Sequence, residues 1–163
     1  MITVNKYVYL FEDGNKDMVD ILGGKGANLA EMMSIGLPVP KGFTVSTTAC
    51  QKYYANAGVL PKEIIKEIDT AILALEKNTN KKFGDINNPL LVSVRSGARV
   101  SMPGMMDTIL NLGLNDEIAK SLLEKTNNKR FVYDSYRRLI LMYADVVKGY
   151  EKNMFERFLD DYK

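Results

Sequence analysis

The spacing of apolar and polar residues predicts strands alternating with helices first, and helices alone towards the end. Residues Lys6 to Phe11 are aromatic and β-branched, which is typical of a strand, and Glu12 to Asp17 is typical of a turn. From Lys25 the apolar spacing becomes helical, and Gly36 ends that helix. The glycines of Gly23 to Gly26 are therefore predicted to lie where a loop enters a helix.

The next segment contains a short strand and two helices. Phe43 to Val45 suits a strand, after which Ser46 or Thr47 can cap a helix that runs through Tyr54. Pro61 suits the first turn of another helix. Apolar residues at helical spacing predict the buried face of that helix: Ile64, Ile68, Ile72 and Leu75.

The remaining chain changes from strand to helix. Leu90 to Arg95 is apolar and β-branched enough for a buried strand, and a loop rich in Gly, Ser, Pro and Met follows. Asp116 is a candidate cap for a helix to Lys125, and a longer helix is predicted from Phe131 to Tyr150. The longer helix carries an apolar stripe that is typical of a helical bundle: Tyr136, Ile140, Tyr143, Val147 and Tyr150. The pattern predicts an α+β chain.

Composition and charge exclude several classes of function. The 163 residues are 46% hydrophobic, enough for a core, and the net charge of +2 provides no broad field for nucleic acid or an anionic membrane. The single cysteine, Cys50, has no intramolecular disulfide partner, so a reducing cytoplasm is the simpler compartment. No apolar run is long enough for a signal peptide or a membrane span.

The sequence contains no histidine. This absence excludes a Ser/His/Asp triad, a Cys/His pair, histidine metal ligands and a phosphohistidine within these residues. The remaining candidates for chemistry are basic residues near glycines.

A lysine flanked by glycines is the first candidate. Gly23, Gly24 and Gly26 allow the backbone to approach a phosphate, and Lys25 supplies a compact positive charge. The spacing does not match the Walker A pattern of GxxxxGK followed by Ser or Thr. The residues alone leave two interpretations open, which are phosphate binding and a simple glycine turn with a solvated lysine.

Arg95 is the second candidate, because a strand would deliver it to the start of a glycine-containing loop. A guanidinium can fork onto phosphate oxygens, and two unit charges about 4 Å apart attract by about 4 kcal/mol at an effective dielectric of about 20, before desolvation costs. A structural ion pair with one of the 20 acidic residues is the alternative.

The loop from Ser101 to Thr108 is the third candidate, because it mixes small residues with three methionines. Methionine can cover a flat surface such as an adenine ring, or it can fill a gap in a core. The hydroxyl groups and backbone N–H groups of the loop could bind phosphate as a closing lid. A packed loop without a ligand is the alternative.

Four blocks of the sequence follow one another in a distinctive order. They are LGGKGANLAEM (22–32), GLPVPKGFTVST (36–47), LLVSVRSGARVSMPGMMDTILNLGLND (90–116) and FVYDSYRRLILMYADVV (131–147). This order resembles the amino-terminal region of the pyruvate, phosphate dikinases and covers nearly the whole chain. The stretch Ser101 to Asp107 is the most specific part, since related pyruvate, water dikinases carry a different loop there.

The resemblance implies an ATP-grasp type nucleotide-binding subdomain over residues 1–112, followed by an incomplete helical subdomain over residues 113–163. It implies that Lys25 and Arg95 match the family's phosphate-contacting lysine and arginine. We expect Lys25 to neutralise charge on the α and β phosphates, Arg95 to orient the β/γ region for attack, and the loop from Ser101 to Met106 to close and exclude water. The implied nucleotide-binding residues are Lys25, Arg95, Ser101, Met102, Pro103 and Gly104, and Arg95 is also the implied catalytic residue.

In the complete enzyme of this family, ATP, inorganic phosphate and pyruvate are converted to phosphoenolpyruvate, AMP and pyrophosphate. The resemblance implies that Mg²⁺ assists, and that the metal ligands, the pyruvate site and the carrier histidine lie outside these residues. A homodimeric full-length enzyme is compatible with it. The chain by itself is predicted to be inactive. A fragment of a pyruvate, water dikinase and a stand-alone nucleotide-binding module are the alternatives.

Overall fold

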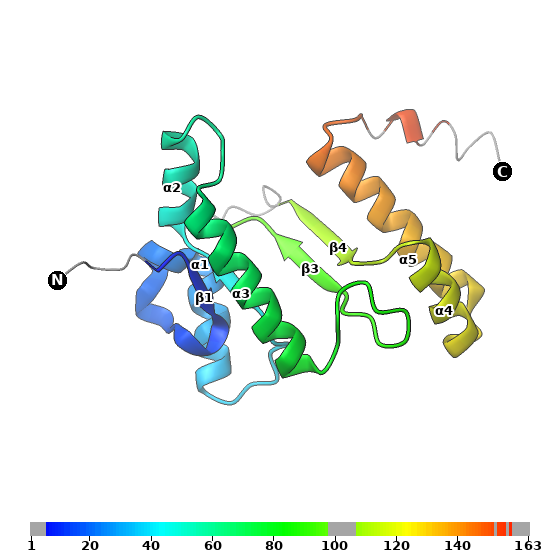
Figure 1. The fold of residues 1–163 in the computed structure, drawn as a ribbon, viewed down its shortest axis with the longest axis horizontal. Coiled ribbons are helices and arrows are strands. Elements are labelled where there is room, and N and C mark those ends of the chain that lie inside the picture. The colour runs from blue at the N-terminus through cyan, green and yellow to red at the C-terminus, as the bar shows by residue number, and fades with distance from the viewer. Residues whose placement is uncertain (1–5, 98–106, 152, 156, 158–163) are drawn as a thin grey trace. The chain divides into compact units, whose positions relative to one another are not determined.

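The computed structural model describes residues 6–97, 107–151, 153–155 and 157. The chain divides into two units, Met1–Asn80 with Gly97–Gly104, and Lys81–Ser96 with Met105–Lys163. Each unit combines helices with a two-stranded antiparallel sheet (Figure 1). The mixed α+β class predicted from the sequence is therefore confirmed, whereas the predicted domain boundary at residue 112 stays a prediction.

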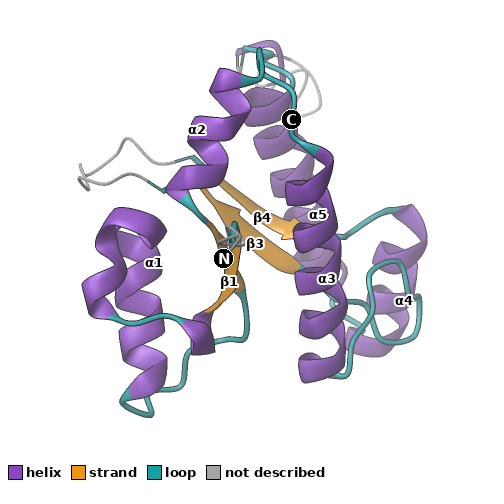
Figure 2. Ribbon diagram, turned by 60° about the vertical axis from the view of Figure 1, so that its left-hand side comes forward, coloured by secondary structure: helices purple, strands orange, loops and turns teal. Residues whose placement is uncertain are grey.

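The first unit places a small sheet between two helices (Figure 2). Val8 and Phe43 pack in a cluster with Ile64 of the third helix, while Thr44 meets Gly26 of the first helix. The side chains of neighbouring strand residues point to opposite faces of a sheet, so Phe43 and Thr44 pack against different helices. The elements are β1 (Val8–Leu10), the 3-10 turns η1 (Phe11–Asp13) and η2 (Lys16–Met18), α1 (Val19–Ser34), β2 (Phe43–Val45), α2 (Thr47–Ala55) and α3 (Lys62–Thr79).

Two polar side chains secure the ends of these elements. The Ser46 hydroxyl accepts a hydrogen bond from the Ala49 N–H at 3.2 Å, so Ser46 is the cap of α2 and Thr47 is its first residue. The Glu67 carboxylate of α3 accepts the N–H groups of Tyr7 and Val8 at 2.7 and 2.9 Å. The buried Ile64 and Leu75 confirm the predicted apolar face of α3.

The second unit contains a strand that the sequence pattern did not predict. Its elements are β3 (Val92–Arg95), β4 (Thr108–Leu112), α4 (Asp116–Thr126), α5 (Lys129–Met142) and the π-helical turn η3 (Tyr143–Val147). β4 falls where a loop was expected, and it pairs antiparallel with β3 through a register irregularity between Val92 and Val94. The expected burial of β3 is wrong, because Ser93, Val94 and Arg95 are exposed on a sheet that contains two strands among the described residues.

The core of the second unit lies between β4, α4 and α5. Its buried residues are Ile109, Leu114, Ile118, Ala119, Val132 and Leu139. Asn115 rather than Asp116 caps α4, since its side-chain oxygen accepts the Ile118 N–H at 2.9 Å. The helix predicted to Tyr150 changes to π geometry at Tyr143. Most of its predicted bundle face lies at the surface of the described residues, because Leu139 rather than Ile140 enters the core.

Candidate functional site

The glycine and lysine segment lies inside α1, not in a loop before it. α1 begins at Val19 and is helical through Ser34, except that Gly23 has φ 70° and ψ 164°. These angles break the helix into two stretches, and a residue without a Cβ adopts them at little cost. The expectation of a loop entering a helix at Gly23 to Gly26 is therefore corrected to a kink within a helix. Lys25 lies two residues after that kink.

Lys25 is partly buried and has no protein partner in the part of the chain that the structure describes. Neither a hydrogen bond nor an ion pair joins its ammonium group to another described residue. Two other lysines of the same unit are paired, Lys6 with Asp13 at 2.8 Å and Lys41 with Glu12 at 2.9 Å. A partly buried cation without a carboxylate partner is available to an external anion.

Close packing holds α1 against β2 next to Lys25. A Cβ placed on Gly26 would lie 3.0 Å from both Oγ1 and Cγ2 of Thr44, and 3.1 Å from Cβ of Leu22. Gly26 therefore permits the close approach of helix and strand. Packing by itself therefore favours glycine at this position.

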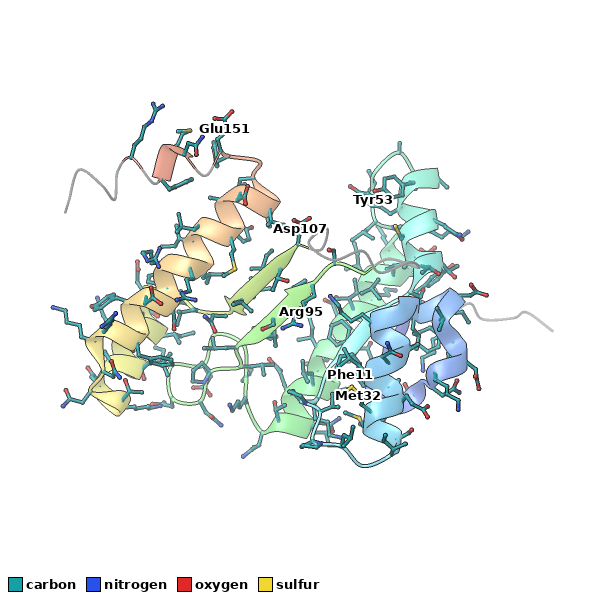
Figure 3. All side chains as sticks on the ribbon, turned by 180° about the vertical axis from the view of Figure 1, so that it is seen from behind. Phe11, Met32, Tyr53, Arg95, Asp107 and Glu151 are labelled. Atoms are coloured by element: carbon teal, nitrogen blue, oxygen red, sulfur yellow. The ribbon has the colours of Figure 1, made fainter. Side chains whose placement is uncertain are left out.

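Arg95 is the last residue of β3 and is exposed to solvent (Figure 3). It lies opposite Thr108 in the ladder, and the following residue, Ser96, donates its N–H to the Asp107 carbonyl at 3.0 Å. No described acidic residue forms an ion pair with the Arg95 guanidinium. The alternative of a structural ion pair therefore finds no partner among the described residues.

Lys25 belongs to the first unit and Arg95 to the second. The structure thus shows two pieces of a candidate site, each inside its own unit. Ser101, Met102, Pro103 and Gly104 lie outside the described residues. Their expected role as a closing loop stays a prediction.

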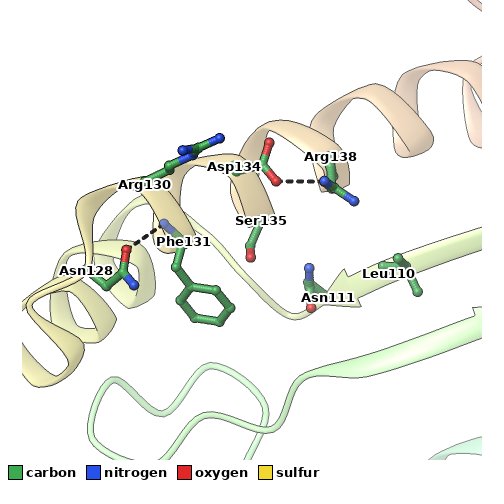
Figure 4. Close-up of a pocket in the computed structure, with 8 residues that line it drawn as sticks. All are labelled: Leu110, Asn111, Asn128, Arg130, Phe131, Asp134, Ser135 and Arg138. Carbon is green, nitrogen blue, oxygen red and sulfur yellow. Dashed lines mark hydrogen bonds and ion pairs between the residues drawn. The ribbon is translucent and has the colours of Figure 1, made fainter.

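A hollow of about 530 Å³ in the second unit involves residues that sequence reasoning did not single out (Figure 4). It lies between the end of β4, at Leu110 and Asn111, and the first turns of α5. The Asp134 carboxylate is bonded there to Arg138 at 2.7 Å and also to Arg137 at 2.7 Å. The hydrogen bond from Arg137, followed by that from Arg138, lowers the pKa of Asp134.

The charge spacing along α5 was the signal that could have indicated this hollow. Arg130, Asp134 and Arg138 recur every four residues, which places them on one face of the helix. Exposed ion pairs of this kind contribute about 0–1 kcal/mol. Neither Lys25 nor Arg95 lines the hollow, and Arg138, one of the two arginines that do, is already paired with Asp134.

Among the described residues, no three or more His, Cys, Asp or Glu side chains gather as a metal site would require. The described helices include none with the length and apolar character needed to cross a bilayer.

Comparison with known proteins places the chain among dikinases. A family model described as "Pyruvate phosphate dikinase, AMP/ATP-binding domain" matches residues 19–64 and 56–140. The chain is 58% identical over 158 residues to "Pyruvate, phosphate dikinase" of Clostridium symbiosum, and 51% identical over 162 residues to that of Rhizobium meliloti (strain 1021). It is 50% identical over 165 residues to "Pyruvate, phosphate dikinase, chloroplastic" of Flaveria pringlei.

These alignments cover 97% to 99% of the chain, but only 17% to 18% of each of the three relatives. The chain therefore spans less than a fifth of the length of the curated relatives that it matches.

Proposed function

Since the chain belongs to the pyruvate phosphate dikinase AMP/ATP-binding domain family, we propose that it is the amino-terminal part of the ATP-binding region of a longer pyruvate, phosphate dikinase. Identity of 50% to 58% over nearly the whole chain supports this proposal. The full-length enzyme would use ATP, inorganic phosphate and pyruvate, and would form phosphoenolpyruvate, AMP and pyrophosphate. An ATP-grasp type site and a cytoplasmic location are part of the proposal.

Lys25 is proposed to neutralise phosphate charge on the bound nucleotide. The observation that carries this role is that Lys25 is a partly buried residue whose ammonium group has no carboxylate partner among the described residues. One phosphate charge about 4 Å away would attract it by about 4 kcal/mol at an effective dielectric of about 20, less the cost of removing water. The kink at Gly23 supports the role, because glycine backbone allows a phosphate to come close.

Arg95 is proposed to orient the transferred phosphoryl group. Its position at the end of β3 anchors its backbone through the ladder with β4, while its side chain is exposed and free of a described acidic partner. A guanidinium can bind two oxygens of one phosphate group at once, which sets orientation as well as charge. The loop containing Ser101 to Gly104 is proposed to close over the nucleotide and exclude water.

The rest of the reaction needs groups from outside these residues. The sequence has no histidine to carry a phosphoryl group, and the described residues offer no cluster of metal ligands. Mg²⁺ is proposed to assist the reaction, with its protein ligands outside these residues. The 163-residue chain alone is expected to form no phosphoenolpyruvate.

The size of the natural polypeptide tests whether the chain is part of a longer enzyme. An antibody against this segment should detect, in an extract of the source cells, a band roughly five to six times heavier than the 18.3 kDa of the chain, because the chain covers 18% of its relatives. A band near 18.3 kDa would instead leave a stand-alone nucleotide-binding module.

Kinetics of the full-length enzyme test the two residue roles. Lys25→Ala and Arg95→Ala should each lower kcat/KM for ATP by roughly 10²- to 10³-fold, the usual loss when one group that stabilises developing charge is removed. Lys41→Ala and Arg137→Ala are matched controls, since each removes a basic group from an exposed ion pair. A kcat/KM for ATP in Lys25→Ala within twofold of that in Lys41→Ala would refute the role of Lys25. The same result for Arg95→Ala against Arg137→Ala would refute the role of Arg95.

A further inference from the structure

The first stretch of α1 is tied to α2 by one side chain. The Thr47 hydroxyl donates a hydrogen bond to the Asp20 carbonyl at 2.6 Å. In an uninterrupted α-helix the N–H of Gly24 would be the partner of that carbonyl, four residues on. The non-helical Gly23 stands between these two groups. Thr47 therefore donates to a carbonyl of the turn of α1 that contains the kink.

The second stretch of α1 is braced by a different threonine. The side chain of Thr44 lies so close to Gly26 that an added Cβ would be 3.0 Å from two of its atoms. Thr44 is itself held in register opposite Tyr9, in the β1–β2 pair. Thr47 and Thr44 are three residues apart and meet α1 before and after the kink, respectively.

Lys25 lies between these two contacts and is flanked by Gly24 and Gly26. Glycine on both sides leaves the backbone of a lysine with more freedom than any other neighbours would. A cation that must meet a phosphate in one geometry needs that freedom removed, because a misplacement of about 1 Å can lower a rate by about 10²-fold. The two threonines are placed to remove it.

We propose that Thr47 and Thr44 are positioning residues, which hold the Gly23 kink in α1 and so fix Lys25 in the geometry that binds nucleotide phosphate. The inference rests on the proposed role of Lys25. Neither threonine is assigned contact with the nucleotide. Thr47 acts through the Asp20 carbonyl, and Thr44 acts by packing against Gly26.

Thr47→Val in the full-length enzyme tests the hydrogen bond, because valine keeps the branched shape and removes the donor. The expected result is a roughly tenfold loss in kcat/KM for ATP with KM for pyruvate unchanged, and a return towards wild type in Thr47→Ser, which retains the hydroxyl. Thr70→Val is the matched control. The Thr70 hydroxyl also donates to a backbone carbonyl of the same unit, that of Lys66 at 2.8 Å, but within α3.

Gly26→Ala tests the packing contact independently. It should also lower kcat/KM for ATP, and adding Thr44→Ala should restore part of the loss, because both Thr44 atoms nearest the new Cβ are then gone. The Cβ of Leu22 at 3.1 Å remains, so the restoration is expected to be incomplete.

The outcomes separate this inference from the proposed function. Suppose that Lys25→Ala lowers kcat/KM for ATP, while Thr47→Val and Thr70→Val have the same kinetics and the same loss in Tm. This result would overturn the positioning role and leave the function of Lys25 intact. Additive effects of Gly26→Ala and Thr44→Ala would overturn the role of Thr44. Unchanged ATP kinetics in Lys25→Ala would overturn the proposed role of Lys25 and this inference together.

Discussion

Gly113 is a position where the structure leaves no room for a side chain. The residue follows β4 and has φ +108°, a conformation that L-residues rarely adopt. A Cβ there would lie 2.6 Å from the backbone carbonyl oxygen of Leu90 and 3.2 Å from the Phe83 ring. The carbonyl cannot rotate away as a side chain can. Relief would require the segment before β3 to move away from the end of β4.

Gly113→Ala is expected to lower the free energy of unfolding by about 3 kcal/mol. A left-handed backbone costs an L-residue about 1–2 kcal/mol, and overpacking adds about 1–3 kcal/mol. Lower chain entropy in the unfolded state returns about 0.4–1 kcal/mol. Gly84→Ala is the matched control, because Gly84 also has positive φ, +76°, but no atom lies within 4 Å of its added Cβ. The control should lose only about 1 kcal/mol.

Urea and thermal unfolding of the chain, followed by circular dichroism, would measure both variants. Gly113→Ala should lower Tm by about 6–12 °C and Gly84→Ala by about 2–4 °C, from the usual scaling for chains of about 150–250 residues. Both glycines belong to the second unit, so both variants report on the same part of the molecule. Equal losses in the two variants would refute the steric argument, leaving only the cost of positive φ.

Three further predictions concern the core, a helix cap and pH. Ile64→Ala should cost about 2–5 kcal/mol by denaturant unfolding, because Ile64 is fully buried, whereas Ile65→Ala at a position 42% exposed should cost much less. Asn115→Ala should cost about 1 kcal/mol in the same assay, because α4 loses its cap. The hydrogen bond that Tyr136 donates to Asp116 at 2.8 Å raises the pKa of the Tyr136 phenol. The stabilisation of the folded state by this hydrogen bond is therefore complete below the unfolded-state pKa of about 10 and is lost as pH rises through the higher folded-state pKa. Between about pH 9 and 11, Tm should therefore fall less in Tyr136→Phe than in the wild type.

The elements that the sequence predicted correctly depend on interactions between near neighbours. Phe43 to Val45 forms the expected strand, Ser46 is one of the two expected caps, and Ile64 lies on the expected buried face of α3. Capping bonds span three residues, and helical faces repeat every three or four residues. Such signals are complete within a short window of sequence.

The features that were missed depend on residues far apart in the chain. β4 forms a strand by pairing with β3, and the burial of β3 was overestimated because the structure describes a single partner strand, β4, beside it. On α5, Leu139 enters the core while Ile140 stays at the surface, although both are apolar. The choice follows from where β4 and α4 pack, which periodicity along one helix does not report.

For the candidate site, the sequence by itself determined the residue types and their family. The glycines around Lys25, the arginine that ends β3 and the four ordered blocks were sufficient to indicate a dikinase nucleotide-binding region, and the comparisons confirmed that family. Those features are covalent and local, so no folded structure was needed to detect them.

Only the tertiary structure decided the surroundings of Lys25. The expected loop is a kink at Gly23, and its two sides meet Thr47 and Thr44, about twenty residues further along the chain. Glycine has no side chain whose character could indicate what packs against it, and a threonine hydroxyl can donate a hydrogen bond to any carbonyl within reach. These contacts therefore exist only once β2 and α2 have packed against α1.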